Sequence, residues 1–433
     1  MTTRTMTARR CRTMRSACSR LFCSLLGSCV LLAGLFLCSA PTPGQDKSPP
    51  RSVGVPYALS SDALKSLEGK PVKIQLKNGK VLEGYRIAKV RVGREEGVLG
   101  SIQIEADSGR KRTLRPGAIA ALEVDGTPFA VAKKPGKSLY VLIDLEARNQ
   151  AIAARLKQQG GRLWPPLSPA QQQKALAEQR RFVRQVLSVF PGVHFEVVET
   201  KFFIFCTNIR PQLIAGYVRD LDRMYTMLCG IFQIPPGTNI FRGKAVVFCF
   251  ATQQERAVFE GRFLNSTPTG TAGKCFQRSD GNVVISSHLV SDLDFFGHVL
   301  VHETAHGVIW RYRSSMRIPT WMNEGIADWV AMKVVPRCRE TQRRQQAAAE
   351  RLRRTHNLEG LFVRESLDGW QYGAASAIVQ MLIELDSRRF GAMFEAIKLG
   401  THWEDALASA YGMTLGDLIA MYGKRIGVPL LRP

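Results

Sequence analysis

Two histidines, His302 and His306, lie four residues apart in an apolar segment that begins near Ser291. The periodicity of this segment predicts a buried helix. On a helix, that spacing projects both side chains from one face, close enough for both imidazoles to bind one zinc ion at about 2.0 Å. Glu303 is rotated by roughly 100° from His302 around the same helix. It therefore falls beside the metal, where a carboxylate can act as the catalytic base toward a zinc-activated water.

A catalytic zinc ion normally takes three protein ligands and leaves the fourth position to water. Glu324 is the candidate third ligand, because it follows His306 by eighteen residues in a second predicted helix. We expect Thr320, after Pro319, to be the N-cap of this helix. Asp328 is four residues past Glu324 on the same face, where it can accept a hydrogen bond from a ligand imidazole and fix its tautomer. The spacing thus predicts a Zn²⁺ site of two imidazoles and one carboxylate.

Two further residues near the motif have weaker assignments. His298 is one turn before His302, but it lies about 12 Å along the helix axis from His306, too far to share one ion. We expect it to pack or to form hydrogen bonds behind the site. Tyr372 opens a predicted helix and is a candidate catalytic donor to the oxyanion of an attacked carbonyl. An ordinary core tyrosine is the alternative.

The elements around these residues predict an α+β fold. Strands are expected over 194–207, 244–250 and 282–286, helices over 211–232 and 253–261, and almost only helices after that. The strand over 281–286 is the expected sheet edge for an extended substrate. Ser291 with Asp294 is the expected start of the helix that carries the two histidines.

The combination His302-Glu303-x-x-His306 and Asn323-Glu324-Gly325-x-x-Asp328 resembles the gluzincin metallopeptidases, the group that includes thermolysin and the zinc aminopeptidases. The resemblance covers roughly residues 190–425. Within that group the chain is most similar to secreted bacterial peptidases of the MA-like type, in which a short barrel-like region can precede the peptidase domain. The resemblance implies a zincin-like fold, Zn²⁺ as cofactor and the following roles: His302, His306 and Glu324 as ligands, Glu303 as base, and Asp328 as the partner of a ligand.

The N-terminal residues have the composition of an export signal. Residues 1–40 contain six arginines and no acidic residue, and residues 21–38 are almost purely apolar. This pattern predicts a signal peptide, or an N-terminal anchor if it is not cleaved. The expected location is periplasmic, cell-envelope or extracellular, with membrane attachment only through residues 21–38.

The rest of the chain divides by composition. Residues 41–55 are rich in proline and predict a linker. Residues 56–138 contain four or five alternating strands, with an Asn78-Gly79 hairpin turn, and predict a small all-β barrel similar to Sm-like or Src-homology-like barrels. Residues 139–190 are expected to form a helical connector, and residues 191–433 the zincin-like domain.

Charge and cysteine spacing limit the classes of partner. The net charge is +24, and residues 41–433 keep 54 basic against 36 acidic residues. A solvated basic surface explains this charge, with an anionic envelope component held by the barrel as the alternative. No aromatic and glycine-rich module accompanies the charge, so no specific nucleic acid is predicted. The five cysteines after residue 40 show no CxxC pair, which excludes a zinc ribbon.

These features lead to one expected function and one alternative. The expected function is a secreted zinc metallopeptidase, a hydrolase that cleaves peptide bonds in peptide or protein substrates. The alternative is a catalytically inactive zincin-fold binding protein of the cell envelope, whose basic barrel holds an anionic partner.

Overall fold

The computed structural model describes residues 55, 57–134, 137–267 and 270–433. Residues 1–40 and nearly all of 41–55 lie outside this part, so the leader, the linker and export remain predictions. Among the described helices, none combines the length and the apolar character needed to cross a membrane. The described chain is mixed α+β: a curled antiparallel sheet comes first, and a second sheet with many helices follows.

The first sheet contains seven strands, where four or five were expected. They are β1 Pro71–Leu76, β2 Val81–Val92, β3 Leu99–Ala106, β4 Lys111–Leu114, β5 Ile119–Val124, β6 Thr127–Lys133 and β7 Tyr140–Asp144. Their order is β2-β1-β5-β6-β7-β3-β4, and the sheet curls because β2 also pairs with β3. The sheet continues to Asp144, past the boundary predicted at residue 138.

Local sequence accounts for this sheet. Buried and exposed residues alternate along β1, so Val72, Ile74 and Leu76 face one core. The Asn78-Gly79 turn joins β1 to β2, and Gly79 has a φ of 84°, which glycine adopts without strain. A short helix, α1 (Ser61–Lys65), precedes the sheet.

Two helices connect the sheets: α2 (Leu145–Gln158) and α3 (Pro169–Leu187). The capping box of α3 is formed by Ser168 and Gln171, with proline in the first turn. Both helices lie inside the predicted connector, 139–190.

The second sheet contains β8 Glu196–Glu199, β9 Phe203–Thr207, β10 Ala245–Phe250, β11 Gly273–Gln277 and β12 Val283–His288. Their order is β11-β12-β10-β9-β8. The three central strands are parallel, and the two edge strands are antiparallel to their neighbours. The single strand predicted over 194–207 was wrong, because the chain turns back between β8 and β9. The predicted edge was also wrong: β12 is internal, and the edge is β11, which the sequence analysis did not predict.

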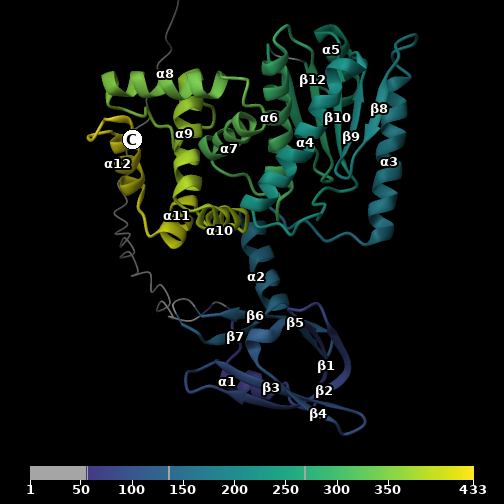
Figure 1. Cartoon of the computed structure of the whole chain (residues 1–433), viewed down its shortest axis with the longest axis vertical. Coiled ribbons are helices and arrows are strands. Elements are labelled where there is room, and N and C mark those ends of the chain that lie inside the picture. Colours follow the sequence, from purple (N-terminus) through teal and green to yellow (C-terminus); the bar gives the residue numbers. More distant parts are fainter. Residues whose placement is uncertain (1–54, 56, 135–136, 268–269) are drawn as a thin grey trace, which may run out of the picture. The chain divides into compact units, whose positions relative to one another are not determined.

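Helices cover both faces of this sheet (Figure 1). One face packs against α4 (Pro211–Ile231) and α6 (Leu293–Arg311), and we call it the α6 side. The other face packs against α3 and α5 (Gln253–Leu264), and we call it the α5 side. Cys206 and Cys249 are buried in this sheet, and all five described cysteines are free thiols.

The remaining helices complete the larger core. They are α7 Thr320–Val334, α8 Glu340–Thr355, α9 Gly369–Leu385, α10 Ser387–Lys398, α11 Trp403–Tyr411 and α12 Leu415–Ile426. Helix α6 is apolar around most of its circumference, since it packs against the sheet, α4 and α7. Polar side chains on α6 are therefore held in fixed positions.

Candidate metal centre

The two helices that carry the motif begin one residue away from their predicted starts. Asp292 is the N-cap of α6 and accepts a hydrogen bond from the Phe295 amide at 2.9 Å, so the cap predicted from Ser291 and Asp294 was wrong. Helix α7 begins at Thr320, with Pro319 in the cap position, so Thr320 is not the N-cap. Neither shift changes the residues that share a helix face.

The structure brings the three predicted ligands together. His302 Nε2 lies 3.1 Å from His306 Nε2 and 3.3 Å from Glu324 Oε2, and His306 Nε2 lies 3.5 Å from the same oxygen. A tetrahedral zinc ion with bonds of about 2.0–2.1 Å holds neighbouring ligand atoms roughly 3.3 Å apart. The three atoms therefore have the spacing of one face of a zinc tetrahedron.

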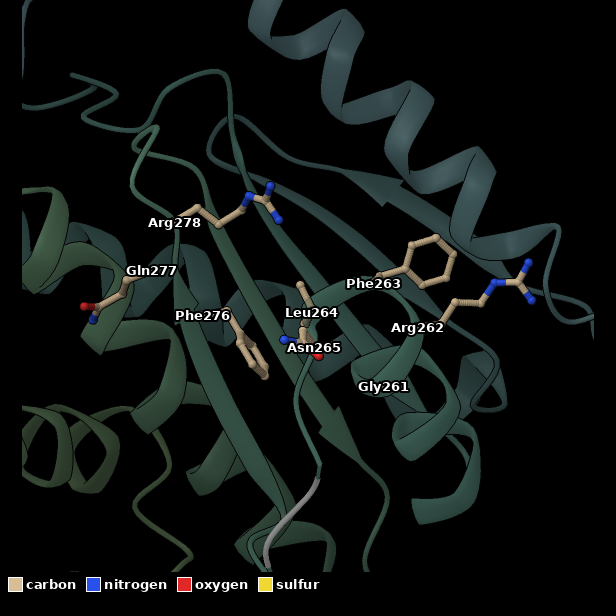
Figure 2. A pocket seen from close by; sticks show the side chains of 8 residues that line it. All are labelled: Gly261, Arg262, Phe263, Leu264, Asn265, Phe276, Gln277 and Arg278. Atoms are coloured by element: carbon tan, nitrogen blue, oxygen red, sulfur yellow. The ribbon is translucent and has the colours of Figure 1, made fainter.

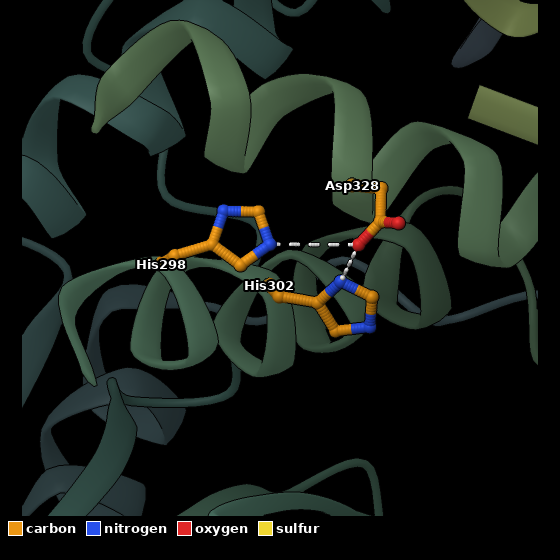
Figure 3. A group of neighbouring side chains, drawn as sticks. All are labelled: His298, His302 and Asp328. Atoms are coloured by element: carbon orange, nitrogen blue, oxygen red, sulfur yellow. Dashed lines mark hydrogen bonds and ion pairs between the residues drawn. The ribbon is translucent and has the colours of Figure 1, made fainter. Parts of the chain in front are cut away.

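Asp328 contacts His302, one of the three predicted ligands, and His298, one helical turn before it (Figure 3). Its Oδ1 accepts a hydrogen bond from His302 Nδ1 at 2.8 Å and lies 3.6 Å from His298 Nε2. Its Oδ2 accepts a hydrogen bond from Arg344 Nη1 at 3.4 Å, and the side chain is fully buried. With a proton on Nδ1, His302 presents its bare Nε2 lone pair to a metal ion.

The group formed by His298, His302 and Asp328 also has the spacing of a metal site. It would use His302 Nδ1, the nitrogen that the 2.8 Å bond to Asp328 occupies with a proton. His298 is almost fully buried, and Asp328 is the polar neighbour of its ring within the described residues. We therefore do not treat this group as a second candidate metal site. Its residues support the candidate site formed by His302, His306 and Glu324.

Charge interactions in the site favour a bound cation. Burial alone would raise the pKa of Glu324, but His306 and His302 outweigh it and lower this pKa well below the ordinary value. Burial would likewise raise the pKa of Asp328, and the neighbouring imidazoles of His298 and His302 lower it instead. Burial would lower the pKa of both ligand imidazoles, yet the carboxylates raise it. Protons therefore compete with a metal ion for this site.

The site opens into a cavity of about 810 Å³ that includes the two ligand histidines, Glu324, Glu303 and Tyr372. Glu303 lies under the edge strand: a Cβ added to Gly273 of β11 would come within 2.8 Å of Glu303 Cγ. The backbone of β11 thus passes directly beside the predicted base.

Tyr372 lies in the first turn of α9 and lines the same cavity. Burial, together with the charges of Glu324 and Asp328, raises the pKa of its phenol, so the hydroxyl keeps its proton at neutral pH. The guanidinium of Arg344 lies 5.7 Å from the centroid of its ring. The role of Tyr372 as an oxyanion donor remains a prediction.

Sequence reasoning missed three features of the site. Arg344 belongs to a basic segment, residues 337–356, in which seven arginines are alike by sequence. His288 is isolated from the other histidines in the sequence, yet it lines the cavity and its Nδ1 lies 3.3 Å from Arg256 Nη1. Strand β11 has no alternating pattern that would have revealed it.

No protein-family model matches the chain, and no curated protein matches its sequence.

Proposed function

We propose that the chain is a zinc metallopeptidase and that residues 191–433 form a zincin-like domain. The main support is the triangle of ligand atoms from His302, His306 and Glu324, with sides of 3.1–3.5 Å. This triangle opens into a cavity beside a sheet edge, with a free carboxylate next to it.

A zinc ion held by these three residues supplies Lewis acidity, which polarises a carbonyl and lowers the pKa of water. The residues of the chain do the rest. Glu303 accepts the proton of the attacking water and returns it to the leaving amine. Asp328 fixes the tautomer of His302, and Tyr372 donates a hydrogen bond to the developing oxyanion.

The edge strand gives the proposed substrate a binding mode. In the described sheet β11 pairs only with β12, so its other side offers unpaired backbone groups. An extended peptide can add to this side as a further strand. Because β11 passes Glu303, a peptide paired with β11 would place a backbone carbonyl near the ligand triangle.

The first test measures metal and turnover together. The purified chain should contain about one zinc ion by elemental mass spectrometry, and Glu324→Ala should lose most of it. Glu303→Gln should keep the zinc and lose hydrolysis of a broad peptide mixture, since only the base is removed.

Two results would count against the proposal in different ways. Substantial hydrolysis by Glu303→Gln would reject this residue as the base. A chain that takes up no metal, even with zinc supplied at neutral pH, would favour the inactive binding protein of the cell envelope instead.

A further inference from the structure

A second cavity, of about 490 Å³, lies along β11 on the α5 side of the sheet. Figure 2 shows the end of α5, with Arg262 and Leu264, on one side of it and the strand residues Phe276 and Arg278 on the other. None of its described lining residues belongs to the ligand triangle. The cavity is therefore distinct from the one that contains Glu303.

The alternation of β11 relates the two cavities. Cys275 packs against the core on the α6 side, whereas Phe276 packs against the core on the α5 side. A peptide that adds to β11 alternates in the same way, because successive side chains of a strand point to opposite faces. One substrate side chain would enter the metal cavity, and its neighbour would enter the second cavity.

Gln277 places the second cavity close to the ligand triangle. It is one of the residues around this cavity, but its side chain points to the α6 side (Figure 2), where its Nε2 donates a hydrogen bond to the backbone oxygen of His306 at 3.4 Å. Gly273, at the other end of the strand, lies against Glu303. From Gly273 to Arg278 an extended chain covers roughly 17 Å, so the second cavity is within a few substrate residues of the cleaved bond.

The charges around this cavity are positive. Arg262 and Arg278 line it, and none of the described lining residues is acidic. Arg278 has one carboxylate nearby, Asp280 at 3.9 Å, and within the described chain Arg262 makes no ion pair. Lys274 adds a third cation on the same face of β11, with its Nζ 5.0 Å from the Phe276 ring centroid.

Apolar residues of this cavity can also contact the methylene groups of a bound acidic side chain. Leu264 and Phe276 both pack against the core on the α5 side and line the cavity with apolar surface. A glutamate places two methylene groups against such a surface and its carboxylate at the rim, where it can pair with a guanidinium in two parallel hydrogen bonds. A lysine or arginine in the same place would meet like charge, which is unfavourable.

We propose that this cavity is a substrate subsite that selects an acidic side chain, an inference that rests on the proposed peptidase function and on pairing of the substrate with β11. Arg262 and Arg278 determine the specificity for an acidic side chain, and Leu264 and Phe276 pack against its methylene groups.

The test measures binding on zinc-loaded Glu303→Gln, in which cleavage does not interfere. Two fluorescein-labelled peptides with alternating Val and Glu, or Val and Gln, are titrated against this protein by fluorescence anisotropy at low salt. The Glu peptide should bind about tenfold more tightly, because both arginines that line the cavity attract its carboxylates and no described lining residue repels them. The preference should shrink in 1 M NaCl, where the Debye length is about 3 Å.

The matched variants locate the effect. Arg262→Gln with Arg278→Gln, added to Glu303→Gln, should bind both peptides equally. Arg354→Gln is the control, since it removes one exposed arginine of α8 from a position outside both cavities. Equal affinity of the two peptides for the parent protein would overturn the acidic subsite, as would an unchanged preference in the double variant.

Hydrolysis separates this inference from the proposed function. If the unsubstituted, zinc-loaded chain cleaves neither peptide yet binds the Glu peptide selectively, the peptidase assignment fails and the acidic subsite stands as a binding site. If it cleaves both at equal kcat/KM, the peptidase assignment stands and the acidic subsite fails.

Discussion

Asp328 of α7 makes polar contacts with two histidines of α6 and with Arg344 of α8. One oxygen accepts a hydrogen bond from His302 Nδ1 at 2.8 Å, and the other accepts one from Arg344. Because the carboxylate is fully buried, these donors are not replaced by water. Its charge and geometry therefore act directly on the ligand imidazole.

We predict that Asp328→Asn weakens zinc binding about 10- to 100-fold. The amide is a weaker hydrogen-bond acceptor than the carboxylate, so the His302 imidazole becomes less basic and its orientation is less well fixed. A competitive zinc chelator measures the dissociation constant. Asp405→Asn, an exposed aspartate in the first turn of α11, is the control. An unchanged zinc affinity in Asp328→Asn would show that the hydrogen bond to His302 does not support the ligand.

Lys398 is fully buried, and its Nζ donates to the backbone oxygens of Met316 at 2.6 Å and Trp310 at 3.3 Å. Burial, followed by the charge of Arg311, lowers its pKa to about 7. In the unfolded chain its pKa is about 10.4. Between these values the unfolded chain binds more protons than the folded chain, so the free energy of unfolding rises with pH in this window.

Lys398→Met should remove this contribution. The free energy of unfolding of the unsubstituted chain, minus that of the variant, should increase by roughly 3 kcal/mol from pH 7 to pH 10. Urea titrations at four pH values measure it, and tyrosine titration cancels in the difference. Lys424→Met, at an exposed site on α12, should give a flat difference. A flat profile for Lys398→Met as well would mean that the buried lysine keeps its ordinary pKa.

The predicted metal ligands were found from the sequence because helix periodicity determines which residues of one helix share a face. Residues four apart share a helix face, which accounts for the pair His302 and His306 and for the pair Glu324 and Asp328. Arg344 was not predictable in this way. Its contact with Asp328 depends on how α8 packs beside α7 and α9, and nothing in its neighbourhood distinguishes it from the other arginines of α8.

At the scale of elements, the close approach of β11 to α6 decides how the proposed base is held. Gly273 has no side chain, and an added Cβ would lie 2.8 Å from both Glu303 Cγ and Val299 Cγ1. The strand can reach the helix only because this residue is glycine.

Gly273→Ala should displace Glu303 or β11 by several tenths of an ångström and lower kcat roughly 10- to 100-fold, while the zinc content stays near one per chain. The control is Gly230→Ala in α4, where an added Cβ meets nothing within 4 Å. That control should keep full activity and gain up to about 1 kcal/mol of stability from helix propensity. Full activity in Gly273→Ala would mean that the contact between strand and helix does not position the base.

Strand β11 could not be predicted from the sequence. Residues 273–277 read Gly-Lys-Cys-Phe-Gln, which lacks the alternation of apolar and polar residues that predicts a strand. Its extended shape comes from pairing with β12, a tertiary effect. The turn between β8 and β9 was missed for a related reason: the apolar residues on both sides of Thr200 and Lys201 looked like one continuous run.

At the scale of the whole molecule, the curled sheet and the helical region are built on separate cores. The buried residues of the first sheet, such as Ile74 and Ile104, form one cluster, and the helices around α6 and α7 form another with no residue in common. The first cluster includes Leu142, so β7 belongs to the curled sheet. A cut that separates the two cores must therefore fall after Asp144.

We predict that a chain of residues 145–433 folds and binds zinc with the affinity of the full chain, because every predicted ligand and every residue of the larger core lies in it. Circular dichroism and a zinc titration check folding and affinity. In the full chain, Ile74→Ala should destabilise the curled sheet by about 2–5 kcal/mol and leave the zinc affinity unchanged. A large loss of zinc affinity in either protein would show that the curled sheet supports the metal centre, and the two regions would then have to be treated as one cooperative unit.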